Sequence, residues 1–244
     1  MRFDKSIALA AAGLIQQLYN NELTPTINEP TTDTQVLIRG GGESPVFVVF
    51  PGSASRADWA TNLRAGKVKG RVAGRVHAGF HEAMESIRTE LSARLAGRHY
   101  VIIAGHSLGG ALATLAADAL DAWMPARVGA VYTFGSPRCG NGAFARSYNA
   151  RLHDQTFRLV TARDPIPRIP WLLGTYRHVG TRVFLDDHGG IEVNPPLWRD
   201  WELMSAVDPT TDRPVPEQTA QELISLEAHH IETYIRKLQE GTEV

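Results

Sequence analysis

The chain has 244 residues, 43% of them hydrophobic and 21% charged, with a formal net charge of −1 at pH 7. This composition is typical of a globular protein with enough chain for a sizeable core, and the balanced charge offers no general field that would recruit nucleic acid. The single cysteine, Cys139, excludes an internal disulfide framework and a zinc ribbon.

The N-terminal segment contains an apolar run, residues 7–15, behind two basic residues. Such a run is also typical of a short signal peptide, but Asp4 is unusual in one. Four apolar residues of the segment share one helical face: Ile7, Ala11, Leu14 and Leu18. We therefore expect residues 1–20 to form an N-terminal amphipathic helix of one domain, residues 1–244, and the protein to be cytoplasmic, or secreted if the segment is a signal peptide. No apolar run reaches the roughly 18 residues that a membrane span needs.

Strand and helix patterns alternate along the rest of the chain. Residues 46–50 read as a buried strand, and the glycine-rich turn before them predicts a hairpin. A helix is predicted next by apolar residues at helical spacing: Phe80, Met84, Ile87, Leu91 and Leu95. Residues 101–103 read as another buried strand before a helix that starts at Leu108. Three later segments contain strands (residues 127–141, 156–170 and 175–187), and residues 227–238 form a closing helix. This order predicts an α/β fold with a doubly wound, mostly parallel sheet flanked by helices.

Four loops follow four of these strands: "PGSAS", "GHSLGG", "GSPRCGN" and "RDPIPRIP". Ligands bind at the carboxyl ends of the strands in such sheets, so we expect these loops to form one site. Ser107, in "GHSLG", matches the G-x-S-x-G nucleophile elbow, which requires a strand before it and a helix after it. The alternative is a plain turn in which Ser107 caps the helix, but that explains only one of the three nearby glycines. The N–H group of Leu108 is the first candidate to stabilise an oxyanion.

Seven segments in order carry a resemblance to a known family: "VVFPGSASRADW", "VHAGFHEA", "GHSLGGALATLAA", "TFGSPRCGN", "DPIPRIP", "YRHVG" and "HHIETY". From about residue 46 to the C-terminus the chain resembles the class 3 lipases, the fungal-lipase-like branch of the α/β-hydrolases. The resemblance implies the α/β-hydrolase fold and a serine ester hydrolase that needs no cofactor. It also implies a catalytic triad in chain order: Ser107 as nucleophile, Asp164 as orienting acid and His229 as base.

Other residues compete for these roles. His230 is the rival base; we favour its neighbour, because the family's histidine stands five residues before a tyrosine. Asp186 or Asp187, after a late strand, could replace the orienting acid. His106 is interpreted as a packing or polar-support residue in the elbow, and His178 as a structural strand residue.

The segment "FPGS" resembles the family's oxyanion segment, and the resemblance implies that Ser53 supplies the second oxyanion donor, paired with Leu108. Pro51 stands where the family usually has arginine, which leaves open how this loop is braced. A plain turn is the alternative for this segment, because proline and glycine also favour one.

Apolar residues near the predicted acid and base are candidates for an acyl-chain pocket or for ordinary core: Ile166, Ile169, Trp171, Trp198 and Trp201. Residues 54–76 occupy the position of the family's lid and carry six bases against one acid. They are interpreted as a solvated hairpin edge, with a mobile flap at an anionic interface as the alternative.

The sequence thus predicts a serine ester hydrolase that acts on acylglycerols through an acyl-enzyme, of the triacylglycerol lipase type. A short-chain carboxylesterase, a phospholipase A1 and a feruloyl esterase remain alternatives on the same triad. From another class, a catalytically dead hydrolase-fold binding module is the alternative. The expected partner is an ester or lipid substrate, with a lipid–water interface as a further expected setting. No H-E-x-x-H motif supports a metal hydrolase.

Overall fold

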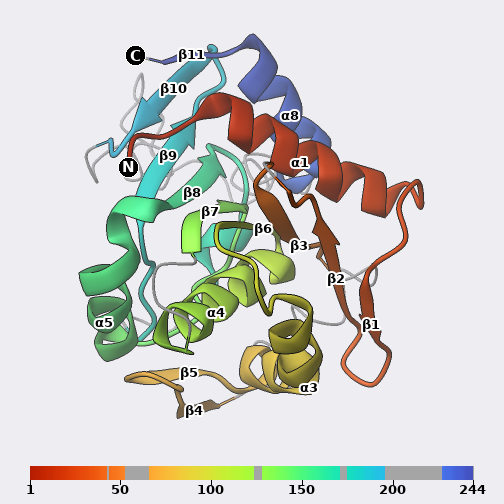
Figure 1. Cartoon of the computed structure of the whole chain (residues 1–244). Coiled ribbons are helices and arrows are strands. Elements are labelled where there is room, and N and C mark those ends of the chain that lie inside the picture. Colours follow the sequence, from red (N-terminus) through yellow and green to blue (C-terminus); the bar gives the residue numbers. More distant parts are fainter. Residues whose placement is uncertain (43, 53–65, 124–127, 171–174, 196–226, 244) are drawn as a thin grey trace.

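The computed structural model describes residues 1–42, 44–52, 66–123, 128–170, 175–195 and 227–243 (Figure 1). Within these residues the chain forms a nine-stranded sheet. Its strands, in spatial order, are β1 (Ile27–Glu29), β2 (Thr34–Arg39), β3 (Val46–Phe50), β6 (Val101–His106), β7 (Val128–Phe134), β8 (Thr156–Thr161), β9 (Thr181–Leu185), β10 (Gly190–Val193) and β11 (Thr242–Glu243). A separate two-stranded hairpin consists of β4 (Lys67–Lys69) and β5 (Arg75–His77).

The centre of the sheet is parallel. Strands β3, β6, β7, β8 and β9 pair in parallel in that order, whereas β2 is antiparallel to β3 and β10 is antiparallel to β9. The predicted strand at residues 46–50 and the hairpin before it are confirmed. Because the central strands run in one direction, the loops that follow β3, β6, β7 and β8 lie at one edge of the sheet, as the sequence predicted.

Helices cover both faces of this sheet (Figure 1). On one face lie α3 (Ala78–Arg94), α4 (Leu108–Trp123) and α5 (Gly142–Leu152), and on the other α1 (Lys5–Tyr19) and α8 (Ile231–Glu240). Along β6, Ile103 packs with the first group and Ile102 with the second. Side chains of a strand alternate between faces, so a strand covered by helices on both sides must be apolar throughout. The structure therefore has the predicted doubly wound α/β-hydrolase architecture.

Local sequence features explain why α1 and α3 form where they do. The Asp4 carboxylate caps α1 by accepting hydrogen bonds from the N–H groups of Ser6 and Ile7, at 2.8 and 3.2 Å. The buried face of α1 is made of small and branched residues: Ala8, Ala11, Ala12, Ile15 and Leu18. All five apolar residues that predicted α3 are buried. Small residues let α1 approach the sheet closely, which places Tyr19, its last residue, near the loop after β3.

One predicted strand is shorter than expected. Residues 175–187 give only β9, which starts at Thr181, so the interpretation of His178 as a strand residue is wrong. Gly180 interrupts the strand with a φ of +68°, a conformation that L residues disfavour. His178 lies in the preceding loop, where its Nε2 atom donates to the carbonyl of Pro167 at 2.7 Å. Burial, followed by the nearby guanidinium of Arg158, holds the pKa of His178 well below its ordinary value.

None of the helices in the described ranges is long and apolar enough to cross a membrane. The extent of the domain, residues 1–244, remains a prediction.

Candidate active site

Ser107 occupies the sharp turn between β6 and α4. Its φ is +57°, in the left-handed region that non-glycine residues seldom adopt, and it is 4% exposed. The flanking glycines make this turn sterically possible. A Cβ atom on Gly105 would lie 2.1 Å from the carbonyl oxygen of Gly109, and one on Gly109 would lie 2.1 Å from that of Phe50. The third glycine, Gly110, packs against the loop after β7, where a Cβ would lie 2.6 Å from a serine side chain. A plain turn would not require these three close contacts.

Asp164 and His229, which are 65 residues apart, meet at the same edge of the sheet. The Nδ1 atom of His229 lies 2.8 Å from Oδ2 of Asp164, and the two side chains are 4% and 0% exposed. Asp164 also accepts hydrogen bonds from the Tyr234 hydroxyl on α8, at 2.6 Å, and from the Ile166 N–H, at 2.8 Å. A buried carboxylate with three donors is fully compensated and fixed in orientation.

The surroundings of this pair leave one nitrogen of His229 available. Because a carboxylate only accepts hydrogen bonds, Nδ1 of His229 carries the proton, and Nε2 of the neutral ring is a free base. Nε2 is buried and has no hydrogen-bond partner among the described residues. The Tyr234 hydroxyl has its pKa raised well above the ordinary value by burial first and then by the negative charge of Asp164, so it remains a donor.

Gly135 is a further requirement that the sequence pattern did not single out. It ends β7 with a φ of +58°, and a Cβ there would lie 2.6 Å from Oδ2 of Asp164 and 2.7 Å from Nδ1 of His229. Any larger residue would separate Asp164 from His229. Its signal in the sequence is the glycine in "TFGS", directly after a buried strand.

The competing candidates lie elsewhere. His230 is half-buried and precedes α8 as its N-cap residue, and only its neighbour contacts Asp164. Asp186 accepts hydrogen bonds from the N–H groups of His188 and Gly190 in a turn. Asp187 binds Lys237 at 2.7 Å. The pairing of Asp164 with His229 is thus the one that the structure contains.

His106, predicted to be a packing or polar-support residue, lies beside His229. Its ring stacks on that of His229, with centroids 4.6 Å apart. Nε2 of His106 lies 2.6 Å from the carbonyl oxygen of His229, and Nδ1 lies 2.8 Å from the Tyr19 hydroxyl. The hydroxyl of Thr161 donates to the next carbonyl back, that of Ala228, at 3.1 Å. The backbone that carries His229 is therefore held from both β6 and β8.

The predicted oxyanion residues are only partly described. Leu108 is the first residue of α4, so its N–H has no acceptor within the helix. Ser53 lies outside the described residues, but the loop before it is present: Pro51 is buried, and the N–H of Gly52 donates to the Tyr19 hydroxyl at 2.7 Å.

Two of the predicted acyl-pocket residues are among the described residues, and Ile169 is half-buried. Ile166 is 7% exposed, and Ile169 packs against the cluster around α3 and α4. The other three lie outside the described residues: Trp171, Trp198 and Trp201.

The described part of the predicted lid segment is the hairpin β4–β5, and three of its bases contact the protein. Lys67 lies 4.5 Å from the ring centroid of Tyr176, and Arg75 donates to the carbonyl of Lys67 at 2.7 Å. Arg71 forms an ion pair with Glu85 of α3. This agrees with a hairpin edge; the flap alternative concerns residues 54–65, which lie outside the described residues.

No group of three or more potential metal ligands gathers within the described ranges.

The family described as Lipase (class 3) matches residues 47–173, so the fold and the elbow have a family counterpart. The chain belongs to the class 3 lipase family. The matched range includes Ser107 and Asp164 but ends before His229.

Among individual proteins, the chain is 35% identical over 167 residues to a secreted mono- and diacylglycerol lipase of Fusarium solani, covering 65% of this chain and 47% of that protein. The chain thus spans about half the length of the curated relatives it matches. A solved triacylglyceride lipase of Rhizomucor miehei superposes with a TM-score of 0.64 at 24% identity, covering 74% of this chain and 78% of the other. Another solved triacylglycerol lipase, described as having a serine protease triad at its catalytic centre, matches with a TM-score of 0.57 at 29% identity, covering 63% and 62%.

Proposed function

We propose that the protein is a serine ester hydrolase that cleaves the carboxylic esters of acylglycerols, with Ser107, Asp164 and His229 as its catalytic triad. The observation that carries this proposal is the buried pair of Asp164 and His229, in which Nε2 of the histidine has no partner among the described residues. The pair lies at the sheet edge where Ser107 occupies its strained turn. A structural histidine buried at this depth would be expected to use both ring nitrogens.

The proposed reaction gives each residue of the triad one role. His229 takes the proton of Ser107 through Nε2 while the Ser107 oxygen attacks the ester carbonyl carbon, and Asp164 stabilises the imidazolium. The carbonyl oxygen becomes an oxyanion, for which the N–H of Leu108 and that of Ser53 are the proposed donors. The imidazolium then gives its proton to the leaving alcohol, which leaves an acyl-enzyme on Ser107. Water, deprotonated by the same histidine, hydrolyses this ester and restores the enzyme.

The substrate class is supported by the relatives, two of which are named for mono-, di- or triacylglycerol substrates. One related lipase structure is described as a model for interfacial activation, which supports a lipid–water interface as the setting. Short-chain carboxylesterase, phospholipase A1 and feruloyl esterase activities are compatible with the same triad.

The first experiment measures hydrolysis of p-nitrophenyl esters from C2 to C16 by the wild type and by Ser107→Ala. Loss of the nucleophile in a serine protease costs on the order of 10⁶ in turnover, and we expect a comparable collapse here. Ser147→Ala, a half-buried serine on α5, is the matched control and should retain full activity.

The chain-length profile then assigns the substrate class. A preference for long acyl chains and for emulsified acylglycerols supports the lipase proposal, and an optimum below about C6 favours a carboxylesterase. Covalent labelling by a serine-directed phosphonate provides a second test. A wild type that neither turns over an ester nor becomes labelled would contradict the proposal and favour the binding module.

A further inference from the structure

The N-terminal helix reaches the proposed active site through one side chain. Tyr19, the last residue of α1, is half-buried, and its hydroxyl contacts both the loop after β3 and the elbow strand β6. It accepts a hydrogen bond from the N–H of Gly52 at 2.7 Å and lies 2.8 Å from Nδ1 of His106. Neither partner is close to Tyr19 in the sequence.

The direction of each hydrogen bond follows from what each atom can do. A carbonyl oxygen only accepts, so Nε2 of His106 must donate to the carbonyl of His229, 2.6 Å away. In a neutral imidazole the other nitrogen, Nδ1, is then an acceptor, so the Tyr19 hydroxyl donates to it. The Tyr19 oxygen in turn accepts from Gly52. The chain of hydrogen bonds therefore runs from Gly52 through Tyr19 and His106 to the backbone of His229.

This chain of hydrogen bonds joins the two parts of the proposed active site whose relative positions matter for catalysis, the oxyanion segment and the base. At one end, the peptide between Pro51 and Gly52 directly precedes Ser53, the proposed oxyanion donor. At the other end is the backbone of the proposed base. Bonding to Tyr19 fixes the orientation of the Gly52 N–H.

Sterics support the same assignment. A Cβ atom on Gly52 would lie 2.6 Å from the Tyr19 hydroxyl and 3.0 Å from Cβ of Ser107. The loop is thus pressed between the tyrosine and the nucleophile. Pro51, which replaces the usual arginine of the family and has no N–H, leaves the brace to another residue.

We infer that Tyr19 is a positioning residue: its hydroxyl braces the oxyanion segment at Gly52 and joins it, through His106, to the backbone of His229. This inference rests on the proposed ester hydrolase function.

The test compares Tyr19→Phe with the wild type and with Tyr148→Phe. Phenylalanine keeps the edge-on ring contact with His106, at 5.7 Å between centroids, and removes only the hydroxyl. Tyr148, fully buried on α5 with its hydroxyl 2.9 Å from that of Thr156, controls for the loss of a buried hydroxyl elsewhere. The readouts are kcat and KM on p-nitrophenyl butyrate, and inhibition by a trifluoromethyl ketone, which forms a tetrahedral oxyanion on the serine, against the methyl ketone of the same length.

Direct loss of one oxyanion donor costs about 10²–10³ in turnover, so loss of its brace should cost about tenfold to a hundredfold in kcat. We expect KM to change by less than about twofold, affinity for the trifluoromethyl ketone to fall with kcat, and affinity for the methyl ketone to stay constant, because only a tetrahedral oxyanion uses the braced segment. Tyr148→Phe should change none of these values.

His106→Gln interrupts the same chain from its other end, which keeps the inference testable if Tyr19→Phe does not fold. Because both substitutions act on the same chain of hydrogen bonds, the double variant should lose no more kcat than the more impaired single variant. Unchanged kcat in Tyr19→Phe, equal effects in Tyr148→Phe, or losses that simply multiply would overturn the inference. In each of these cases the wild type would still be active. If the proposed function itself is wrong, the wild type will show neither esterase activity nor labelling.

Discussion

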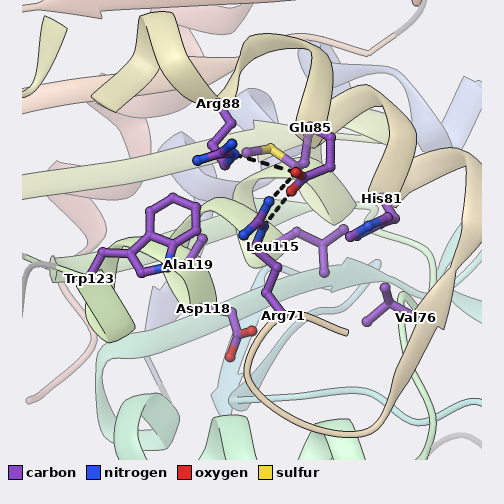
Figure 2. A pocket seen from close by; sticks show the side chains of 10 residues that line it. Arg71, Val76, His81, Glu85, Arg88, Leu115, Asp118, Ala119 and Trp123 are labelled. Carbon is purple, nitrogen blue, oxygen red and sulfur yellow. Dashed lines mark hydrogen bonds and ion pairs between the residues drawn. The ribbon is translucent and has the colours of Figure 1, made fainter. Parts of the chain in front are cut away.

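Two clusters of charged and aromatic side chains in this molecule use the same kinds of contact in different surroundings. Asp164, His229 and Tyr234 are buried at the sheet edge. Figure 2 shows the second cluster, between α3, α4 and the β4–β5 hairpin, where Arg71 and Arg88 both pair with Glu85 beside the ring of Trp123. In that cluster the paired side chains are 31–41% exposed.

The second cluster leaves little room for a ligand. The pocket in Figure 2 encloses about 20 Å³ of free space, enough for a single water molecule and too little for a substrate. Its ion pairs face solvent, where an ion pair contributes little. In the buried cluster each hydrogen bond is strengthened by the low dielectric of its surroundings. Burial, rather than the number of charged contacts, should therefore separate a site with function from a surface brace, and substitutions in the two clusters should differ accordingly.

The largest effect in this comparison should come from Asp164→Asn. The amide cannot stabilise the imidazolium, and its NH₂ group faces donors rather than acceptors. In a serine protease the equivalent change lowers kcat by about 10⁴, and we expect a loss of that order on a short-chain ester. Asp187→Asn, which removes the exposed partner of Lys237, is the control and should keep its kcat. A loss smaller than about tenfold in Asp164→Asn would contradict the assigned role.

Tyr234→Phe should have an intermediate effect. It removes one of three donors to a buried carboxylate, a kind of hydrogen bond worth about 1.5–3 kcal/mol, and we expect the free energy of unfolding to fall by about that amount. Tyr148→Phe loses a buried hydrogen bond to a neutral hydroxyl and should cost less, about 0.5–1.5 kcal/mol. Urea denaturation of both variants measures the difference. Equal costs would mean that the charge of the acceptor does not matter at this site.

The fold was largely readable from local patterns. Strands such as β3 and β6 are continuous apolar runs because helices cover both faces, and α3 repeats its apolar residues at helical spacing. The alternation of strands and helices was enough to bring the carboxyl-end loops together, because parallel strands of one sheet place them at one edge. Only the family resemblance, and no local signal, separated His229 from His230.

Long-range contacts were harder to predict. Nothing around Tyr19 indicates that its hydroxyl meets Gly52, because that contact depends on how closely α1 packs on the sheet. Gly135 is likewise explained only by side chains that arrive from β8 and from the turn before α8. Ile166 and Ile169 show the limit of composition: an apolar residue beside the Asp164 motif is as compatible with the core as with a pocket. Ile166 is buried and Ile169 is half-buried against the core, so both interpretations stay predictions.

The smallest effect should come from Glu85→Gln in the exposed cluster. The Nε atom of Arg71 donates a hydrogen bond to the Glu85 carboxylate at 2.5 Å. This hydrogen bond is the main cause that lowers the pKa of Glu85 from its ordinary value of 4.5. A carboxyl whose pKa is lower in the folded state adds stability above its unfolded pKa and loses it as the pH falls through the folded value. At pH 7 we therefore expect the substitution to cost about 0–1 kcal/mol in the free energy of unfolding, because the pair is screened by solvent.

The loss in the free energy of unfolding in Glu85→Gln should depend on pH and on salt. The cost should shrink as the pH falls below about 4.5, where most Glu85 carboxyls of the unfolded chain are protonated. It should also shrink in about 1 M salt, where the screening length is only about 3 Å. Glu90→Gln, whose partner Arg94 is 3.0 Å away on the same helix and 52% exposed, is the matched control and should cost still less. Activity should be unchanged in both. A loss in the free energy of unfolding above about 2 kcal/mol that does not depend on salt is expected only of a buried pair. Such a result would contradict the conclusion that exposure distinguishes this cluster from that of Asp164 and His229.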